Sequence, residues 1–289
     1  IKTGVAIFLT AWICELLHWP PVFAVITAIV TIEPTVSDSI KKGIIRFPAS
    51  AIGSAYAVLF ISLFGNSAIT YTLAAVFTIA TCYKLKLHAG LLVATLTSVA
   101  MIEVIHSNYL VSFFVRLGTT TTGLIVSTLV NFLILRPNYT KEILENVSSV
   151  ASNTGRLIEQ TFKKILENNN RSDQSLLDMI TSLRKKSQQT ELLIRFQKDE
   201  AKYHPLVGSE KDQFNEAQKK LLQLRLMQYH IDNLMNTPLE TLSWTEEERQ
   251  MILASVHDLA ISLQDKSHYR ADLHQDKLKR LMEQFWEDN

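Results

Sequence analysis

The sequence predicts an all-α protein: a six-span membrane helical domain made of two inverted three-span repeats, followed by a cytoplasmic antiparallel helical bundle. Three observations predict this class. The composition changes near Arg136-Pro137, the first part repeats itself after seventy residues, and the second part has apolar residues at helical spacing. We place the transmembrane domain at residues 1–136 and the cytoplasmic helical domain at residues 137–289.

The two parts differ in charge, although the whole chain has a net charge of +1. Residues 1–136 carry five Lys, three Arg and four acidic residues, a net charge of +4. Residues 137–289 carry 21 basic and 24 acidic residues, a net charge of −3. Because the first part is apolar almost throughout, it is typical of membrane spans, and the second part is typical of a charged helical domain.

The repeat relates residues 17–63 to residues 87–133 without a gap, and 11 of the 47 positions are identical. The first-copy residues are Leu17, His18, Ala24, Thr27, Ile32, Glu33, Ser37, Arg46, Gly53, Leu59 and Leu63, each matched seventy residues later. We place the copies at about 1–66 and about 71–136. Each copy holds three apolar segments, and an odd number of spans inverts the second copy relative to the first.

Six spans are expected, because a spanning helix needs about 20 mainly apolar residues. They are about 3–19, 21–34, 47–65, 67–83, 88–105 and 109–135, of which the second is short. The chain begins at Ile1 inside an apolar run, so we expect that the extreme N-terminus is missing, and no cleavable signal peptide is recognisable.

The basic residues predict the orientation of these spans. They are Lys2, Lys41, Lys42, Arg46, Lys84, Lys86, Arg136 and Lys141, and in the six-span arrangement they all fall on one side. That side is expected to be the cytoplasm. The sequence therefore predicts a multi-pass protein of the cell membrane, surrounded by membrane lipid, with both termini cytoplasmic.

Helices are also expected throughout the second part, at about 138–167, 173–203, 211–235, 245–266 and 268–287. Breaks separate them at Asn168-Asn169-Asn170, His204-Pro205 and Thr237-Pro238, and Ser172 and Asp173 resemble a helix cap. Thr245 followed by three Glu residues opens the fourth helix, because the acids favour its N-terminal dipole. Short connections between such helices predict an antiparallel bundle.

The candidate site residues recur as a triplet in each copy of the repeat. They are Glu33, Arg46 and Gly53 in the first copy, and Glu103, Arg116 and Gly123 in the second. One interpretation is a structural Glu–Arg ion pair within each copy, since charges near a bilayer are costly unless they are paired or wet. The other is that these residues bind or gate an anionic substrate. Gly53 and Gly123 are expected to pack helices.

Arg116 is the stronger substrate-binding candidate, because it lies seven residues inside the sixth expected span. A guanidinium matches a carboxylate bidentately, so a carboxylate substrate is natural. The run that contains Thr119, Thr120 and Thr122 follows Arg116. These hydroxyl residues either pack helices or line a polar pathway.

Several classes of function are disfavoured by the sequence. Cys14 and Cys82 lie in apolar runs and form no disulfide framework or metal motif. Phosphate-binding loops, HExxH, CxxC and nucleophile elbows are absent from the sequence. We therefore expect no enzyme, no catalytic residues, no metal, no cofactor, no nucleic-acid partner and no ATP-driven transport by this chain alone.

The first repeat contains a family-like motif: Glu33-Pro34-Thr35, Ser39, Lys42-Gly43, Arg46, Ser50 and Gly53. It resembles the motif after the second span of the aromatic acid exporter and fusaric acid resistance superfamily. The layout of short spans followed by a helical domain resembles the bacterial aromatic acid exporter family 1 with its C-terminal exporter domain. Many superfamily members have Gln at the position of Glu33, which implies that the acid is not essential to a shared mechanism.

This resemblance implies efflux of aromatic carboxylates. The plant aluminium-activated malate channels have a similar architecture and are dimers, which implies a homodimer here. We therefore expect a cytoplasmic-membrane exporter of small organic anions with a secondary mechanism. Two alternatives stay open: a passive anion channel, and a membrane scaffold or regulator whose helical domain binds an accessory protein.

Overall fold

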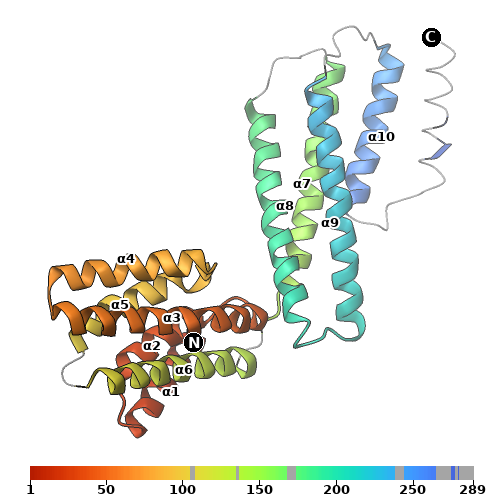
Figure 1. Ribbon diagram of the computed structural model, residues 1–289. Coiled ribbons are helices and arrows are strands. Elements are labelled where there is room, and N and C mark those ends of the chain that lie inside the picture. The colour runs from red at the N-terminus through yellow and green to blue at the C-terminus, as the bar shows by residue number, and fades with distance from the viewer. Residues whose placement is uncertain are drawn as a thin grey trace. The chain divides into compact units, whose positions relative to one another are not determined.

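The computed structural model describes residues 1–104, 108–134, 137–167, 174–237, 244–264, 275–276 and 279 (Figure 1). These residues form ten α-helices and one short 3-10 helix, and no strand occurs among them, so the all-α prediction is confirmed for this part of the chain. The structure divides into two compact units. The first comprises residues 1–138 and 196–205, and the second comprises residues 139–195 and 206–289. The predicted boundary residue Arg136 lies outside the described residues.

Six α-helices form the first unit. They are α1 (Lys2–Leu16), α2 (Pro21–Thr31), α3 (Val36–Phe64), α4 (Ala68–Lys84), α5 (Leu91–Val104) and α6 (Tyr109–Leu133), with the 3-10 helix η1 (His88–Gly90) before α5. Helix α3 begins eleven residues before the predicted third span. It begins there because the Thr35 hydroxyl accepts a hydrogen bond from the backbone N–H of Asp38 at 3.1 Å, which caps the helix.

Two helices of this unit, α3 and α6, are long and apolar enough to cross a membrane. The segments Pro21–Thr31 and His88–Val104 are shorter apolar helices. The two long helices occupy corresponding places at the ends of the two copies. Six spans, their inversion and a cytoplasmic location of the helical domain stay predictions.

The third helix of each copy packs against the second helix of the other copy. Helix α3 of the first copy packs against α5 of the second, and α6 of the second copy packs against α2 of the first. A Cβ atom on Gly53 would lie 2.3 Å from the carbonyl oxygen of Ala94, and one on Gly123 would lie 2.4 Å from that of Ala24. Ala24 and Ala94 are themselves matched by the repeat, so the same close backbone approach occurs twice.

Helices α3 and α6 meet at a matched pair of residues. The hydroxyl oxygens of Ser50 and Thr120 lie 3.2 Å apart in a buried hydrogen bond. These residues are seventy positions apart, so each is the counterpart of the other. Two related residues touch each other only beside the axis that relates the copies. The contact therefore supports a local two-fold arrangement of the repeats.

The repeat also includes α1 and α4, with an offset of 68 residues rather than seventy. Ala6, Thr10 and Cys14 are fully buried, as are Ala74, Thr78 and Cys82 at the corresponding places. Two residues after the end of each helix the backbone has a positive φ, 56° at His18 and 58° at Lys86. The second copy has two more residues between this end and its next α-helix, where it forms η1.

The first unit buries many small polar side chains and exposes many large apolar ones, whereas a water-soluble domain does the opposite. Small hydroxyl residues are buried between its helices, among them Thr10, Thr27, Ser54, Thr78, Ser98 and Ser127. Large apolar residues are exposed, among them Phe8, Leu63, Leu92, Leu110, Phe114 and Leu133. An exposed apolar surface of this kind suits contact with lipid, and small buried residues suit close helix packing in a membrane.

The second unit is built from α7 (Thr140–Leu166), α8 (Gln174–Glu200, its last residues grouped with the first unit), α9 (Gly208–Met235) and α10 (Glu246–Gln264). Helix α7 packs against α9 and α10, around an apolar core that includes Val150, Leu157 and Leu224 (Figure 1). Asn168–Asn170, Ser172, Asp173 and Pro238 lie outside the described residues, as does most of the predicted last helix.

Thr245 lies at the start of α10, as the sequence indicated, and Glu248 completes a capping box with it. The Glu248 carboxylate accepts a hydrogen bond from the backbone N–H of Thr245 at 2.7 Å, and the Thr245 hydroxyl accepts one from the backbone N–H of Glu248 at 3.3 Å. The backbone hydrogen bond from Thr245 lowers the pKa of Glu248 below its ordinary value.

Candidate functional site

Arg116 lies on α6 of the first unit, with 4% of its surface exposed. Its Nη2 donates a hydrogen bond to the hydroxyl of Thr97 on α5. Its guanidinium carbon lies 4.2 Å from the ring centroid of Phe23 on α2, a cation–π contact. Nε and Nη1 are buried and have no hydrogen-bond partner. The guanidinium therefore keeps donors that the protein does not satisfy.

A cavity of about 210 Å³ lies beside Arg116. Its walls are mainly apolar and are formed by Pro20, Phe23, Met101, Val104, Val111 and Val115, with Ser112 and Thr119 as polar members. Drug-sized ligands occupy pockets of roughly 300 Å³ or more, so this cavity suits a smaller molecule. One buried cation at the edge of an apolar cavity can fix the orientation of a small anion.

The first copy places the matched arginine differently. Nη2 of Arg46 lies 2.8 Å from Oε1 of Glu33, and Nζ of Lys42 lies 2.7 Å from Oε2. Nε of Arg46 donates to the carbonyl oxygen of Ala89 at 3.2 Å. The Glu–Arg ion pair therefore forms in this copy, as one of the two interpretations of the sequence expected.

Hydrogen bonds hold the segment that carries Glu33. The side-chain amide of Asn131 donates to the carbonyl oxygen of Glu33 at 3.1 Å and to the hydroxyl of Ser39 at 2.9 Å. Ser39 donates in turn to the carbonyl oxygen of Thr31 at the end of α2, at 3.1 Å. Nζ of Lys2 donates to Oδ1 of Asn131 at 3.0 Å. Helices α1, α2, α3 and α6 thus all contribute to fixing Glu33.

The corresponding ion pair is not formed in the second copy, which corrects the expectation of a Glu–Arg pair in each copy. Glu103 is exposed and accepts a hydrogen bond from the hydroxyl of Tyr71. Among the described residues no ion pair joins Glu103 to Arg116. The physical reason lies in the surrounding side chains. The residues that match Ser39, Lys42 and Asn131 are Tyr109, Ser112 and Ile61, which supply no second cation and no amide.

The threonines after Arg116 differ in role: one of them lines the cavity, and the others pack within the helices. Thr119 and Thr120 are fully buried, and their hydroxyls donate to the backbone carbonyl of Arg116 at 2.9 and 3.0 Å. Thr122 is half-buried and donates to the carbonyl of Gly118 at 3.0 Å. Of this run, Thr119 lines the cavity. The hydroxyl donors of all three are used within α6, which favours a packing role for Thr120 and Thr122.

Phe23 and Thr97 were not predicted as site residues. Thr97 is identical to Thr27 in the other copy, a weak signal, because hydroxyl residues are common in these helices. Phe23 has Val93 as its counterpart, so the repeat gave no indication of it. Phe23 reaches Arg116 because α2 packs against α6, and Thr97 reaches it from α5, which packs against α3. A linear pattern does not reveal either approach.

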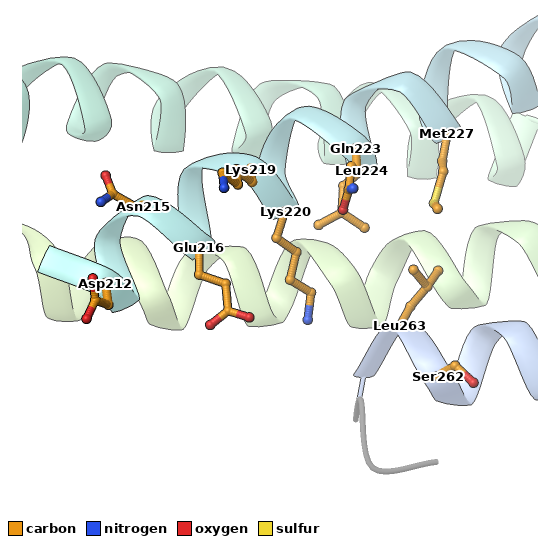
Figure 2. Close-up of a pocket in the computed structure, with 10 residues that line it drawn as sticks. All are labelled: Asp212, Asn215, Glu216, Lys219, Lys220, Gln223, Leu224, Met227, Ser262 and Leu263. Carbon is orange, nitrogen blue, oxygen red and sulfur yellow. The ribbon is translucent and has the colours of Figure 1, made fainter. Parts of the chain in front are cut away.

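The second unit has a more open groove of about 590 Å³ between α9 and α10. Figure 2 shows Glu216 and Lys220 extending side by side from α9, and Met227 facing Leu263 of α10. Its lining mixes acidic and basic side chains and gives no single charge to select a ligand. In the described part of the chain, no group of three His, Cys, Asp or Glu residues could hold a metal ion. The Arg116 cavity is therefore the better candidate site.

Comparison with known proteins places the chain in a family. Residues 1–134 match the family model described as aromatic acid exporter family member 1. The UPF0421 protein OB2406 of Oceanobacillus iheyensis is 53% identical over 291 aligned positions, covering 100% of this chain and 83% of the relative. A UPF0421 protein of Bacillus cereus (strain ATCC 10987) is 44% identical, covering 99% and 80%.

A third relative, the UPF0421 protein SH1063 of Staphylococcus haemolyticus, is 42% identical over 255 residues, covering 88% of this chain and 77% of its own length. These relatives extend into the second unit, whereas the family match ends at residue 134. A C-terminal exporter domain is thus not identified by that match. The chain belongs to the family of UPF0421 proteins, and its first 134 residues match the aromatic acid exporter family.

Proposed function

We propose that this protein exports small organic anions, aromatic carboxylates in particular, across the cell membrane. The observation that carries the proposal is the Arg116 guanidinium, which is buried beside an apolar cavity while Nε and Nη1 have no partner. The family match of residues 1–134 supports the same class of function.

The chemistry of the cavity favours an aromatic carboxylate. A charged side chain in the middle of a bilayer costs about 2.5–3.5 kcal/mol or more, so an unpaired Arg116 favours a bound anion. Hydrogen bonds between a guanidinium and a carboxylate are short and strong. The aromatic ring of the substrate would pack against Phe23 and the aliphatic walls. The charge and the ring of such a molecule therefore both find partners.

The rest of the proposal concerns the membrane. The exposed apolar surface of the first unit and the two long apolar helices support a multi-pass protein of the cell membrane. We place both termini in the cytoplasm, following the basic residues. Six helices enclose little space, so we propose a homodimer. The sequence contains no phosphate-binding loop, which favours a secondary mechanism driven by an ion or substrate gradient.

The experiment is efflux of radiolabelled benzoate from liposomes that contain the purified full chain. Arg116→Gln removes the charge and is expected to reduce efflux at least about tenfold, the equivalent of one charge-assisted hydrogen bond. Arg116→Lys keeps the charge but loses the planar donor array, so its efflux should lie between that of the wild type and that of Arg116→Gln. Arg225→Gln is the matched control, because Arg225 is an exposed arginine paired with Glu191 in the second unit. Unchanged efflux by Arg116→Gln at normal protein levels would refute the proposal.

The same assay separates the alternatives. A carrier shows efflux that depends on an imposed proton or substrate gradient and is accelerated by unlabelled benzoate on the opposite side. A passive channel shows neither dependence, although it would use the same arginine. A scaffold shows no flux and no effect of Arg116→Gln on flux.

A further inference from the structure

We propose that Arg46 forms a second anion-binding site, and that Glu33 is a carboxylate of the chain itself that fills this site until a substrate anion displaces it. The inference extends the proposed function, because it places a second carboxylate site on the same substrate path. It is carried by the contacts of Arg46, by the difference between the two copies, and by the charges around Arg46.

The contacts of Arg46 show that its guanidinium binds a carboxylate in the observed conformation. Arg46 is 6% exposed, and its Nη2 lies 2.8 Å from Oε1 of Glu33. Its Nη1 is buried and has no hydrogen-bond partner. A single internal carboxylate therefore leaves one nitrogen of this cation unsatisfied. A substrate carboxylate positioned between Nη1 and Nη2 could engage both nitrogens, which is the stronger, bidentate arrangement.

The second copy has the matched arginine without an internal carboxylate. Arg116 matches Arg46, and Glu103 matches Glu33, but Glu103 bonds to Tyr71 instead. The main chain around the two arginines is matched, as the glycine contacts of α3 and α6 show. The arginine of the first copy thus binds an internal carboxylate, and the arginine of the second copy binds none among the described residues. Glu33 occupies the place that a ligand carboxylate would take.

The charges around Arg46 indicate how an anion reaches it. Lys41 and Lys42 stand where the Arg116 site has Val111 and Ser112. The side chain of Lys42 is 39% exposed, whereas that of Glu33 is 13% exposed. Lys41 is more open still, with 61% of its side chain exposed, and its Nζ lies 4.0 Å from Oδ1 of Asp199. A cluster of three cations with two partly open to water attracts anions and raises their local concentration. This site therefore selects by charge, whereas the Arg116 cavity also selects by apolar contact.

The basic residues of this region also define the side that we predict to be cytoplasmic. The Arg46 site would then be where a small carboxylate first binds from the cytoplasm, before it reaches the Arg116 cavity. Displacement of Glu33 by the arriving anion would release the ion pair and its segment. The ligand class is a small monocarboxylate, with weaker dependence on an aromatic ring than at Arg116.

The test is the number of benzoate sites per chain, measured by titration calorimetry on the full chain in nanodiscs. At benzoate concentrations that just fill the Arg116 site, the wild type should bind one benzoate per chain, because at Arg46 benzoate must first displace Glu33. Glu33→Gln removes the competing charge but keeps an oxygen near Arg46, so it should bind a second benzoate. Glu103→Gln is the matched control: it removes the counterpart acid, which occupies no arginine, so the number of sites should not change.

Two further variants separate this inference from the proposed function. Arg116→Gln alone should bind none at the same concentrations, whereas Arg116→Gln combined with Glu33→Gln should bind one, at Arg46. If Arg116→Gln binds like the wild type, the proposed substrate site is wrong. A second site gained in Glu33→Gln supports the inference in either case. If Glu33→Gln gains no site, the inference is overturned.

Folding of the variants is checked by size-exclusion profile and melting temperature. If Glu33→Gln does not fold, the number of benzoate sites is measured on Glu33→Asp instead. This variant keeps the charge, but its side chain is one methylene shorter. It cannot hold Arg46 and Lys42 at the observed 2.8 and 2.7 Å together without movement. It should therefore show a second benzoate site that is weaker than the first. A single site in a folded Glu33→Asp would also overturn the inference.

Discussion

The two copies of the repeat place the same arginine in opposite situations. In the first copy Arg46 is paired with Glu33, and Lys42 binds the other oxygen of the same carboxylate. In the second copy Arg116 contacts a hydroxyl and an aromatic ring, and its unsatisfied donors lie beside a cavity. The helices that carry the two arginines pack alike, so their backbone does not explain the difference.

The difference comes from a few side chains around each glutamate. Ser39, Lys42 and Asn131 fix Glu33, and none of them has an equivalent at the matched position. A motif repeated in sequence therefore keeps its helix packing but not its electrostatics. The packing depends on small residues that both copies retain, whereas the ion pair depends on neighbours that only one copy has.

The largest expected effect tests the shared packing. Gly53→Val and Gly123→Val each place a side chain against a backbone carbonyl 2.3 or 2.4 Å from the new Cβ, so the helices must separate. We expect a loss of about 3 kcal/mol in the free energy of unfolding for either variant. The measurement is reversible unfolding in mixed micelles.

Gly4→Val is the control for this comparison, because no atom lies within 4 Å of a Cβ added at Gly4. It should change stability by less than about 1 kcal/mol. Tolerance of valine at only one of Gly53 and Gly123 would break the equivalence of the two copies.

A smaller effect tests the electrostatic difference. Glu33→Ala leaves Arg46 and Lys42 without their carboxylate in a largely buried place, and should lower the free energy of unfolding by about 2 kcal/mol. Glu103→Ala removes an exposed acid that bonds to Tyr71, and should lower it by less than about 1 kcal/mol. Both are measured by the same unfolding assay, and equal losses would contradict the asymmetry.

The smallest effect tests the contact between matched residues. Ser50→Ala and Thr120→Val each remove one side of the hydrogen bond between α3 and α6. The coupling energy from the double-mutant cycle should be about 0.6 kcal/mol, typical of hydrogen bonds between membrane helices. Strictly additive losses would show that the two hydroxyls do not interact.

Much of the fold could be predicted from the sequence, because helix periodicity and breaks are local signals. The helices of the second unit lie close to the predicted ranges, and the cap of α10 follows from Thr245 and Glu248. The third span is predicted to begin at about residue 47, after the basic residues Lys41, Lys42 and Arg46, whereas α3 begins at Val36. In the structure these charges lie on the helix itself.

The site could be predicted only in part. Arg116 and Arg46 stand out as ionisable residues in apolar segments, and their repetition gives a second signal. Their partners could not be inferred, because Phe23 and Thr97 reach Arg116 from other helices. Whether Glu103 turns toward Arg116 or Tyr71 depends on side-chain geometry rather than on spacing along the chain.

The most direct test of the account is a structure of the full wild-type chain with 4-iodobenzoate, in which the iodine locates the ligand by anomalous scattering. We predict one iodine per chain in the apolar cavity next to Phe23, with the carboxylate at Arg116, and none at Arg46 while Glu33 occupies it. A saturated crystal in which the Arg116 cavity holds no iodobenzoate would contradict the central claim that this arginine binds the substrate anion.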